Sequence, residues 1–292
     1  MSKRISLEKD LTGLWSKSGW DQTKEALHIQ AWIREYFEKN NLSVGVIGLS
    51  GGLDSSVVAY LCVEALGAER IRGLLLPERE VTAVADMADA KLIAGRLGIE
   101  TTEYDISPLV SAFASQNPKL LEKEADGSPT YRTQLGNVKA RIRMIKLYEE
   151  AQMRLENSCV LGTTDRSEWL MGYFTKYGDG GVDVEPVLGV YKTQMRALAK
   201  MLGVPDVVLG KPSSPNLISG LSAEQELGLS YEELDTVLAY LIDQNYLESN
   251  IEQGKKRLKD ECGIGDSVTE LVLSRLQSTA HKRAMPPSPP RN

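Results

Sequence analysis

The hydrophobic and polar positions of this chain follow two alternating patterns. Apolar residues at helical spacing predict helices over residues 22–39, 55–66, 82–97, 137–155 and 191–202. Short and mostly apolar runs predict strands over residues 42–49, 71–76, 100–105 and 158–162. Strand and helix are therefore expected to alternate along the chain as far as residue 202.

Strands of this length, separated by long helices, are typical of a parallel sheet with helices on both faces. We therefore predict an α/β fold built on a Rossmann-like, doubly wound parallel sheet. Ligands of such sheets bind beyond the carboxyl ends of the strands. The loops at 48–55, 76–81 and 162–168 should converge at that edge.

Composition narrows the class of protein. The chain has 292 residues, is 42% hydrophobic and carries a formal net charge of -6. These values suit one large domain, with or without a helical annex, and disfavour a protein that coats nucleic acid or an anionic membrane. We see no apolar stretch near the ~20 residues of a membrane span and no signal peptide. Cys62, Cys159 and Cys262 show neither metal-binding nor disulfide spacing, so we expect a cytoplasmic protein.

The sequence GLSGGLDS at residues 48–55 joins the first predicted strand to a helix. Such a junction directs free backbone N–H groups and the positive end of a helix dipole at a ligand, and glycine lets an anion approach the backbone. Asp54 would repel a phosphate unless a divalent cation lay between them. The segment has neither the lysine of GxxxxGK[ST] nor the spacing of GxGxxG. A tight turn with Asp54 at the helix N-terminus is the alternative interpretation.

A second set of polar residues follows the strand predicted at 158–162. Thr163 and Glu168 would lie at the same edge of the sheet as Asp54. Glu168 could then complete a Mg²⁺ site with Asp54, because magnesium is commonly held by one or two carboxylates and phosphate oxygens. Alternatively, Glu168 is a solvated residue in the first turn of a helix.

The stretch at 174–183 combines aromatic rings with Lys176 and Asp183. Aromatic side chains can stack on a flat ring while the two charged side chains bind its polar substituents. A surface turn with a cation–π contact is the alternative.

Several motifs resemble known families. SGGLDSS at 50–56 resembles the SGGxDS loop of the ATP pyrophosphatase superfamily, which splits ATP between its α- and β-phosphates. GTTDRSE at 162–168 and GYFTKYGDGGVD at 172–183 resemble the NAD synthetase family. Further segments similar to that family are GNVKARIRM at 136–144, YKTQ at 191–194, LGVP at 202–205, ELGLSYEELD at 226–235 and HKR at 281–283. The similarity extends from about residue 25 to residue 290.

The resemblance implies an adenine nucleotide alpha hydrolase-like fold and the final step of NAD biosynthesis. The nicotinate carboxylate of deamido-NAD attacks the α-phosphorus of ATP, and pyrophosphate leaves. Ammonia then displaces AMP from the acyl-adenylate and gives NAD. Catalysis of this kind depends mainly on positioning and charge neutralisation. The implied partners are deamido-NAD, ATP and ammonia, with Mg²⁺ as cofactor and with neither nucleic acid nor membrane.

The resemblance also implies roles for single residues. The catalytic set is Asp54, Glu168, Asp183 and Lys192, with Asp54 and Glu168 as metal ligands. The set that binds ATP is Gly48, Leu49, Ser50, Gly51, Gly52, Leu53, Asp54, Ser55, Arg79, Thr163, Lys192 and Ser213. The set that binds deamido-NAD is Arg141, Phe174, Lys176, Asp183, His281 and Lys282. Without the motif, Lys192 would be interpreted as a solvated lysine on an amphipathic helix.

Residues 1–292 are predicted to form a single NAD synthetase domain. Its expected appendages are an N-terminal extension at 1–21, a mobile loop at 206–225 that closes over ATP, and a C-terminal arm at 281–292. The family usually has an Asp where this chain has Ala223, so we expect weaker closure of the loop.

Ammonia is the expected nitrogen donor. The chain has no spare length for a fused glutaminase, and Ser2 rather than Cys follows the first methionine. The family further implies a homodimer in which the helices predicted at 22–39 and 137–155 pack across a two-fold axis, although such helices would equally suit a monomer core.

Two other interpretations stay open. One is an adenylating enzyme of the same superfamily that acts on transfer RNA, which the acidic net charge and the missing cysteine pair disfavour. The other is an inactive paralogue that binds nucleotide as a sensor or scaffold. The presence of Asp54, Glu168 and Lys192 disfavours it.

Overall fold

The computed structural model of the chain describes residues 11, 15, 19–79, 81–117, 129–153, 157–213 and 222–289. These residues contain a four-stranded sheet with the strand order β3-β2-β1-β4, in which every pairing is parallel. Its strands are β1 (Val44–Gly48), β2 (Ile71–Leu75), β3 (Glu100–Glu103) and β4 (Ser158–Leu161). The predicted parallel sheet and α/β fold are confirmed, and each strand end lies within two residues of its predicted position.

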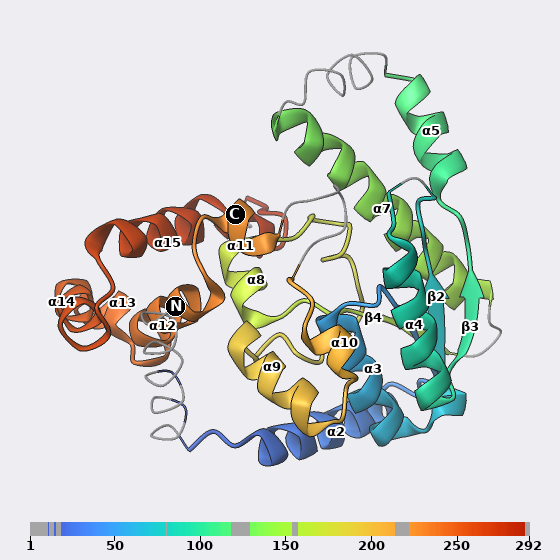
Figure 1. The fold of residues 1–292 in the computed structure, drawn as a ribbon, viewed down its shortest axis with the longest axis horizontal. Coiled ribbons are helices and arrows are strands. Elements are labelled where there is room, and N and C mark those ends of the chain that lie inside the picture. The colour runs from blue at the N-terminus through green and yellow to red at the C-terminus, as the bar shows by residue number, and fades with distance from the viewer. Residues whose placement is uncertain are drawn as a thin grey trace.

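Helices cover both faces of the sheet (Figure 1). One face carries α2 (Gln22–Lys39), α3 (Leu53–Leu66), α4 (Val84–Leu97) and α9 (Lys192–Met201), and the other carries α5 (Ser107–Ser115) and α7 (Pro129–Met153). The alternation of side chains along a strand produces the two cores. In β1, Ile47 packs in the core beneath α2 and α3, whereas its neighbour Val46 packs in the core beneath α7.

Most predicted helices are confirmed closely. The helix predicted at 22–39 has those bounds, and three others agree within two residues. The helix predicted at 137–155 is longer: α7 begins eight residues earlier, at Pro129. Proline is well tolerated in a first helical turn because the N–H groups of that turn have no acceptor within the helix. The N–H that proline lacks therefore costs no hydrogen bond there. The described part of α7 ends at Met153, so the last two predicted residues lie outside the described residues.

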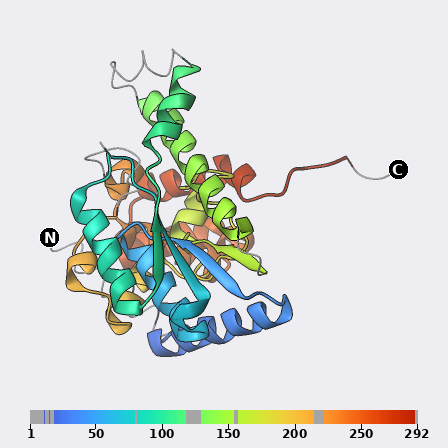
Figure 2. The same ribbon diagram turned by 90° about the vertical axis from the view of Figure 1, so that its right-hand side faces the viewer.

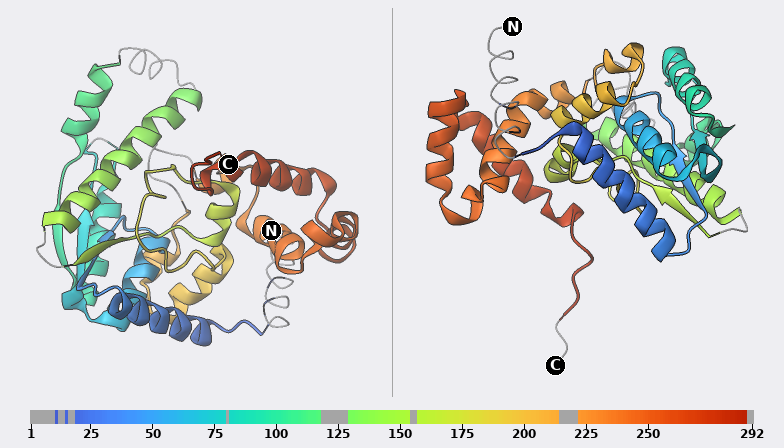
Figure 3. Two further views of the ribbon diagram at one scale, coloured as in Figure 1. Left: turned by 180° about the vertical axis from the view of Figure 1, so that it is seen from behind. Right: turned by 90° about the horizontal axis from the view of Figure 1, so that it is seen from below.

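The C-terminal part of the chain packs around an additional apolar core, to which Leu11 and Trp15 also contribute. The helices after the sheet are α8 (Arg166–Met171), α10 (Asp206–Leu209), α11 (Ala223–Leu227), α12 (Tyr231–Leu238) with a π-helical turn at Ala239–Asp243, α13 (Tyr246–Ser249), α14 (Ile251–Cys262), α15 (Asp266–Ser278) and a final 3₁₀ turn at Ala280–Lys282. Seen from behind, the layer formed by α11 to α15 lies beside the sheet, and α8 and α9 lie between this layer and the sheet (Figure 3).

Two parts extend beyond this body. α5 and the beginning of α7 project past the sheet, and the residues after the final 3₁₀ turn run outward as an extended tail (Figure 2). Most of the predicted extension at 1–21, residues 214–221 of the predicted mobile loop and residues 290–292 lie outside the described residues. The single-domain organisation stays a prediction. Among the described helices, none is both long and apolar enough to cross a membrane.

Candidate active site

The glycine–serine loop joins β1 to α3 at the carboxyl edge of the sheet. Gly51 has a φ of +74°, and a Cβ there would lie 2.1 Å from the carbonyl oxygen of Asp86 in α4, so glycine is required. The Ser50 and Ser55 hydroxyls lie 3.0 Å apart, and the Gly52 N–H donates to the Ser50 hydroxyl at 3.2 Å. These hydrogen bonds fix the turn of the loop, and the missing side chain of Gly51 lets its backbone lie close to α4.

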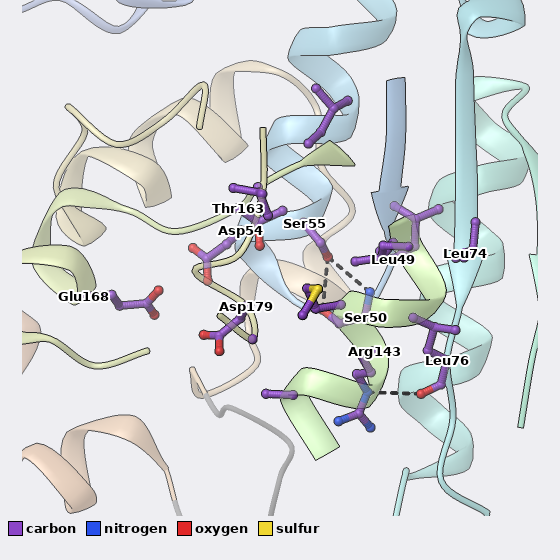
Figure 4. Close-up of a pocket in the computed structure, with 18 of the residues that line it drawn as sticks. Leu49, Ser50, Asp54, Ser55, Leu74, Leu76, Arg143, Thr163, Glu168 and Asp179 are labelled. Carbon is purple, nitrogen blue, oxygen red and sulfur yellow. Dashed lines mark hydrogen bonds between the residues drawn. The ribbon is translucent and has the colours of Figure 1, made fainter. Parts of the chain in front are cut away.

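A cavity of about 270 Å³ lies where the loops after β1, β2 and β4 meet (Figure 4). The predicted convergence of these loops is thereby confirmed. The predicted ATP-site residues that line it are Gly48, Leu49, Ser50, Asp54, Ser55, Thr163 and Ser213, together with the predicted metal ligand Glu168. Gly51, Gly52 and Leu53 belong to the loop without lining the cavity.

Lys192 lies just behind this lining, and its ammonium is surrounded by carboxylates. Its Nζ lies 2.7 Å from Asp54 Oδ2, 2.8 Å from Glu168 Oε1 and 2.8 Å from Asp165 Oδ2. Lys192 and Asp165 are both 0% exposed. Burial alone would lower the pKa of Lys192, but the charges of Asp165, Asp54 and Glu168 raise it well above its ordinary value. Lys192 is therefore a buried cation and not the solvated lysine of the alternative interpretation.

Hydrogen bonds from α8, α9 and α12 fix this cluster in place. Asp165 caps α8 by accepting from the Glu168 N–H at 2.8 Å. The Ser167 hydroxyl donates to Asp235 at 2.6 Å and accepts from the Lys192 N–H at 2.9 Å. Asp235 also accepts from the Thr193 N–H, and burial raises its pKa to about 7. Sequence reasoning missed Asp165 and Asp235, although both lie inside quoted motifs.

The carboxylates of this cluster suit a hard cation such as Mg²⁺. Asp54 Oδ1 is a buried oxygen without a hydrogen-bond partner among the described residues, and Asp54 and Glu168 both line the cavity. Two carboxylates leave the other coordination positions to water and phosphate oxygens, which is how Mg²⁺ usually binds beside nucleotides. As placed, the described residues contain no group of three or more His, Cys, Asp or Glu side chains able to hold a metal.

The wall formed by α7 and by the turn after α8 contains residues that sequence reasoning did not assign. Arg143 and Asp179 both face the cavity in Figure 4. Arg143 Nε donates to the Leu76 carbonyl at 3.2 Å, and burial lowers the pKa of its guanidinium. Burial raises the pKa of Asp179, which accepts from the Thr175 N–H at 2.8 Å. Arg143 lies in the GNVKARIRM segment, and the similarity of this segment to the NAD synthetase family was the signal that could have identified it.

Most residues predicted to bind deamido-NAD come together around the turn after α8. The Phe174 ring stacks on Trp169 with centroids 4.9 Å apart. Lys282 Nζ donates to the carbonyls of Gly172 and Phe174, at 2.7 and 2.6 Å, and lies 5.3 Å from the Phe174 ring. Lys176 Nζ donates to the His281 carbonyl at 2.8 Å, and Arg141 donates to the Lys176 carbonyl at 3.3 Å.

None of the six residues predicted to bind deamido-NAD lines this cavity, and Arg79 does not line it either. The Asp183 carboxylate accepts from the Tyr148 hydroxyl at 2.9 Å and from the Val160 N–H at 2.8 Å, and so joins α7 to β4. The Arg79 side chain is 79% exposed and lies 2.8 Å from Asp105. Their binding roles stay predictions.

A parallel sheet with a glycine–serine loop after its first strand, and a lysine–carboxylate cluster at the same edge, define an ATP-binding α/β enzyme. The comparison with known families is more specific. The family described as NAD synthase matches residues 25–286, and the chain belongs to this family.

Individual relatives agree with this assignment. The NH₃-dependent NAD⁺ synthetase of Methanosarcina acetivorans is 44% identical over 269 residues, which cover 92% of this chain and 98% of the relative. The NH₃-dependent NAD synthetase of Campylobacter jejuni has a TM-score of 0.71 at 30% identity and covers 93% of this chain and 100% of its own. The NMN synthetase of Francisella tularensis has a TM-score of 0.74 at 30% identity, with 92% and 99% coverage.

Proposed function

We propose that this chain catalyses the ATP-dependent amidation of deamido-NAD to NAD, with ammonia as nitrogen donor and with release of AMP and pyrophosphate. Membership of the NAD synthase family and relatives of nearly equal length support this reaction. The single observation that carries the proposal is the buried ammonium of Lys192, which lies among carboxylates at the end of the SGGLDSS loop. This arrangement brings a fixed positive charge to the place where a nucleotide's phosphates would be split.

The first chemical step is supported by the ATP half of the site. The nicotinate carboxylate forms a bond to the α-phosphorus while the bond to pyrophosphate breaks. The loop from Gly48 to Ser55 would bind the departing pyrophosphate through hydroxyls and backbone N–H groups. Lys192 would offset the charge that develops there. Asp54 and Glu168 would hold Mg²⁺, which when bound neutralises phosphate charge and orients the oxygens.

The second step needs the acyl-adenylate to be held while ammonia attacks. The ammonia nitrogen forms a bond to the acyl carbon, AMP leaves with the bonding electrons, and a proton is lost. Phe174 would stack on a flat ring of deamido-NAD. Arg141, Lys176, His281 and Lys282 would bind its polar groups, and Asp183 would position the nicotinate end.

We further propose a homodimer formed by α2 and α7. Both helices expose large apolar side chains, Leu27 and Trp32 on α2 and Ile145 and Met153 on α7, which is unusual for a helix surface that faces only water. Sedimentation should give the dimer mass for the unaltered protein and a shift toward monomer for Ile145→Asp. Leu92→Asp, at a similarly apolar exposed position on α4, serves as the control. A monomeric unaltered protein would contradict this assembly.

We place the enzyme in the cytoplasm as a single domain of residues 1–292, with the loop at 206–225 closing over ATP. The three cysteines are buried free thiols, which is compatible with a reducing compartment.

The decisive test is NAD formation by the purified protein. ATP, Mg²⁺ and deamido-NAD are supplied with ammonium in one series and with glutamine in another, and Asp54→Ala is the control. We expect ammonium to support equal amounts of NAD and AMP, and the control to lose both. Binding of both nucleotides without turnover would favour the inactive paralogue, and dependence on transfer RNA would favour the other adenylating enzyme.

A second candidate function follows from the structural similarity to an NMN synthetase. An enzyme that made NMN by the same chemistry would amidate nicotinate mononucleotide, which lacks the adenylate half of deamido-NAD. Competition between the two substrates in the same assay separates the candidates. We expect a higher kcat/KM for deamido-NAD than for nicotinate mononucleotide. The reverse preference would favour NMN synthesis as the function of this chain.

A further inference from the structure

The lysine at the start of α9 occupies the centre of a set of three carboxylates. Lys192 Nζ donates to Asp54 and Glu168 at 2.7 and 2.8 Å, and the oxygen of Asp165 lies 2.8 Å away as an ion pair. The ring of Tyr231, itself fully buried, lies 5.3 Å from the ammonium on another side. The ammonium is thus enclosed by groups of this chain.

The two donor hydrogen bonds of Lys192 go to the side chains that face the cavity. Asp54 and Glu168 line the cavity, whereas Lys192 and Asp165 do not. The oxygens that bind the ammonium therefore belong to the same carboxylates that the proposed function assigns to Mg²⁺. A lysine bound in this way competes directly with a metal ion for these carboxylates.

The charge of the cluster makes this competition strong. Three carboxylates and one ammonium give a net charge of -2. Without the ammonium, the three negative charges would be largely buried and unpaired. Burying unpaired charges costs far more free energy than leaving them exposed to water. These charges must therefore be offset by a cation or by protonation of the carboxylates, and in this structure the ammonium of Lys192 offsets them.

We propose that Lys192 is the resident cation of the metal site: it occupies Asp54 and Glu168 in the free enzyme, so that a divalent cation binds only together with nucleotide phosphates. This inference rests on the proposed function, since phosphate oxygens give the ammonium other acceptors when it leaves the two carboxylates. Asp165 is the positioning residue. It is fully buried, it caps α8, and it remains beside Lys192 as an anchor when the contacts with Asp54 and Glu168 are given up.

The experiment measures binding of Mn²⁺ alone, and in parallel Mg²⁺ alone, without nucleotide. Mn²⁺ binding is followed by electron paramagnetic resonance and by the shift of the unfolding temperature. The variants are Lys192→Met, which removes the charge and keeps the length of the side chain, and the double variant Lys192→Met/Asp165→Asn. The double variant keeps the net charge of the cluster at -2, so that it can fold even if the single variant cannot.

The matched control is Lys139→Met. Lys139 is also buried, but it pairs with the single carboxylate of Glu78 at 2.7 Å. We expect Lys192→Met to bind Mn²⁺ about 100-fold more tightly than the unaltered protein, because a positive charge within a few ångströms has been removed. The double variant should gain less, because it also loses a negative charge, but it should still gain, because Asp54 and Glu168 are no longer occupied by the ammonium. Both should also gain unfolding temperature when Mn²⁺ or Mg²⁺ is added. The control should do neither.

Three results would overturn the inference. The first is that the unaltered protein binds Mn²⁺ without nucleotide as tightly as the variants do. The second is that the folded double variant gains no affinity. Adding Asp54→Asn to the double variant should cancel the gain, and a gain that persists would locate the metal elsewhere and also overturn it. These binding measurements do not require turnover, so a failure of the proposed amidation would be recognised separately in the NAD assay.

Discussion

The two halves of the candidate site hold their cations by different means. In the ATP half, Lys192 is fully buried and contacts the carboxylates of Asp54, Asp165 and Glu168. In the half assigned to deamido-NAD, Lys176 and Lys282 donate to backbone carbonyls near the C-terminal tail. Loss of the first cation leaves charges uncompensated, whereas loss of either of the others leaves only neutral carbonyls without that donor.

This difference assigns separate tasks to the two halves. The carboxylate cluster is fixed by buried hydrogen bonds among α8, α9 and α12, so its geometry is set when these helices pack together. Lys176 in the turn donates to main-chain oxygens of the tail, and Lys282 in the tail donates to main-chain oxygens of the turn. Such contacts with neutral oxygens are less costly to exchange for contacts with a ligand than contacts with buried carboxylates. We therefore expect changes in the first half to affect kcat and changes in the second to affect KM for deamido-NAD.

The largest effect should come from Asp54→Asn. The amide keeps the size of the side chain but removes a charge that binds both Lys192 and the proposed Mg²⁺. We expect kcat for pyrophosphate release to fall by about 10²- to 10³-fold, the range found when one electrostatic group of a catalytic site is removed. Asp266→Asn, at an exposed position of α15, is the control. If the variant changed only KM for deamido-NAD and left kcat unchanged, the assignment of separate tasks to the two halves would be wrong.

The next effect should come from Lys282→Met. This change removes the tail cation nearest the Phe174 ring. We expect KM for deamido-NAD to rise about tenfold, the equivalent of one charge-assisted hydrogen bond, with KM for ATP unchanged. Lys255→Met removes a half-buried lysine of α14 that pairs with Glu270, and it should leave both constants unchanged. An equal fall of kcat with constant KM would show that the halves are not separable.

A pH-dependent effect is expected at Glu185, which lies behind the loop between the halves. Its carboxylate accepts from the Thr164 N–H at 3.1 Å, and burial raises its pKa from 4.5 to about 8. Between these two values the folded state keeps a proton that the unfolded state has released, so this group's stabilising contribution is full below pH 4.5 and is lost as the pH rises toward 8. The slope is at most about 1.4 kcal/mol per pH unit.

Glu185→Gln should remove this dependence. Urea unfolding at several pH values between 5 and 8 should show the variant gaining stability relative to the unaltered protein as the pH rises. Parallel curves for the two proteins would mean that Glu185 ionises normally in the folded state.

The smallest effect should come from Arg79→Met. The side chain is exposed and paired with Asp105 at the edge of the ATP half, and exposed ion pairs of this kind contribute little. We expect KM for ATP to rise about two- to threefold, with Arg257→Met on α14 as the control. An unchanged KM for ATP would mean that Arg79 does not contribute to ATP binding.

Sequence alone predicted the sheet and the edge at which the site forms, because both depend on local patterns. Short apolar runs located the strands, helical spacing located α2, and the glycine pair at 51–52 marked the loop, where the structure requires glycine at Gly51. Asp54 and Glu168 were predicted to meet because each follows a strand of the same parallel sheet.

The missing parts of the site depend on contacts between segments far apart in the chain. Asp235 meets Ser167 across 68 residues, and no spacing within either segment indicates that pairing. The burial of Lys192 follows from the packing of α8, α9 and α12 around it, whereas its own helix looks amphipathic and solvated. The helices after residue 222 were not predicted, although α14 buries Gly254, Leu258 and Cys262 at helical spacing.

The shortness of α8 has an optical consequence. This helix of six residues starts at the Asp165 cap beside Lys192, and the carbonyls near its other end accept from Lys282 and Arg283. Trp169 lies in the middle of it and stacks on Phe174. The indole is therefore a built-in fluorophore placed between the two halves, and its emission should report the arrival of either substrate without an attached dye.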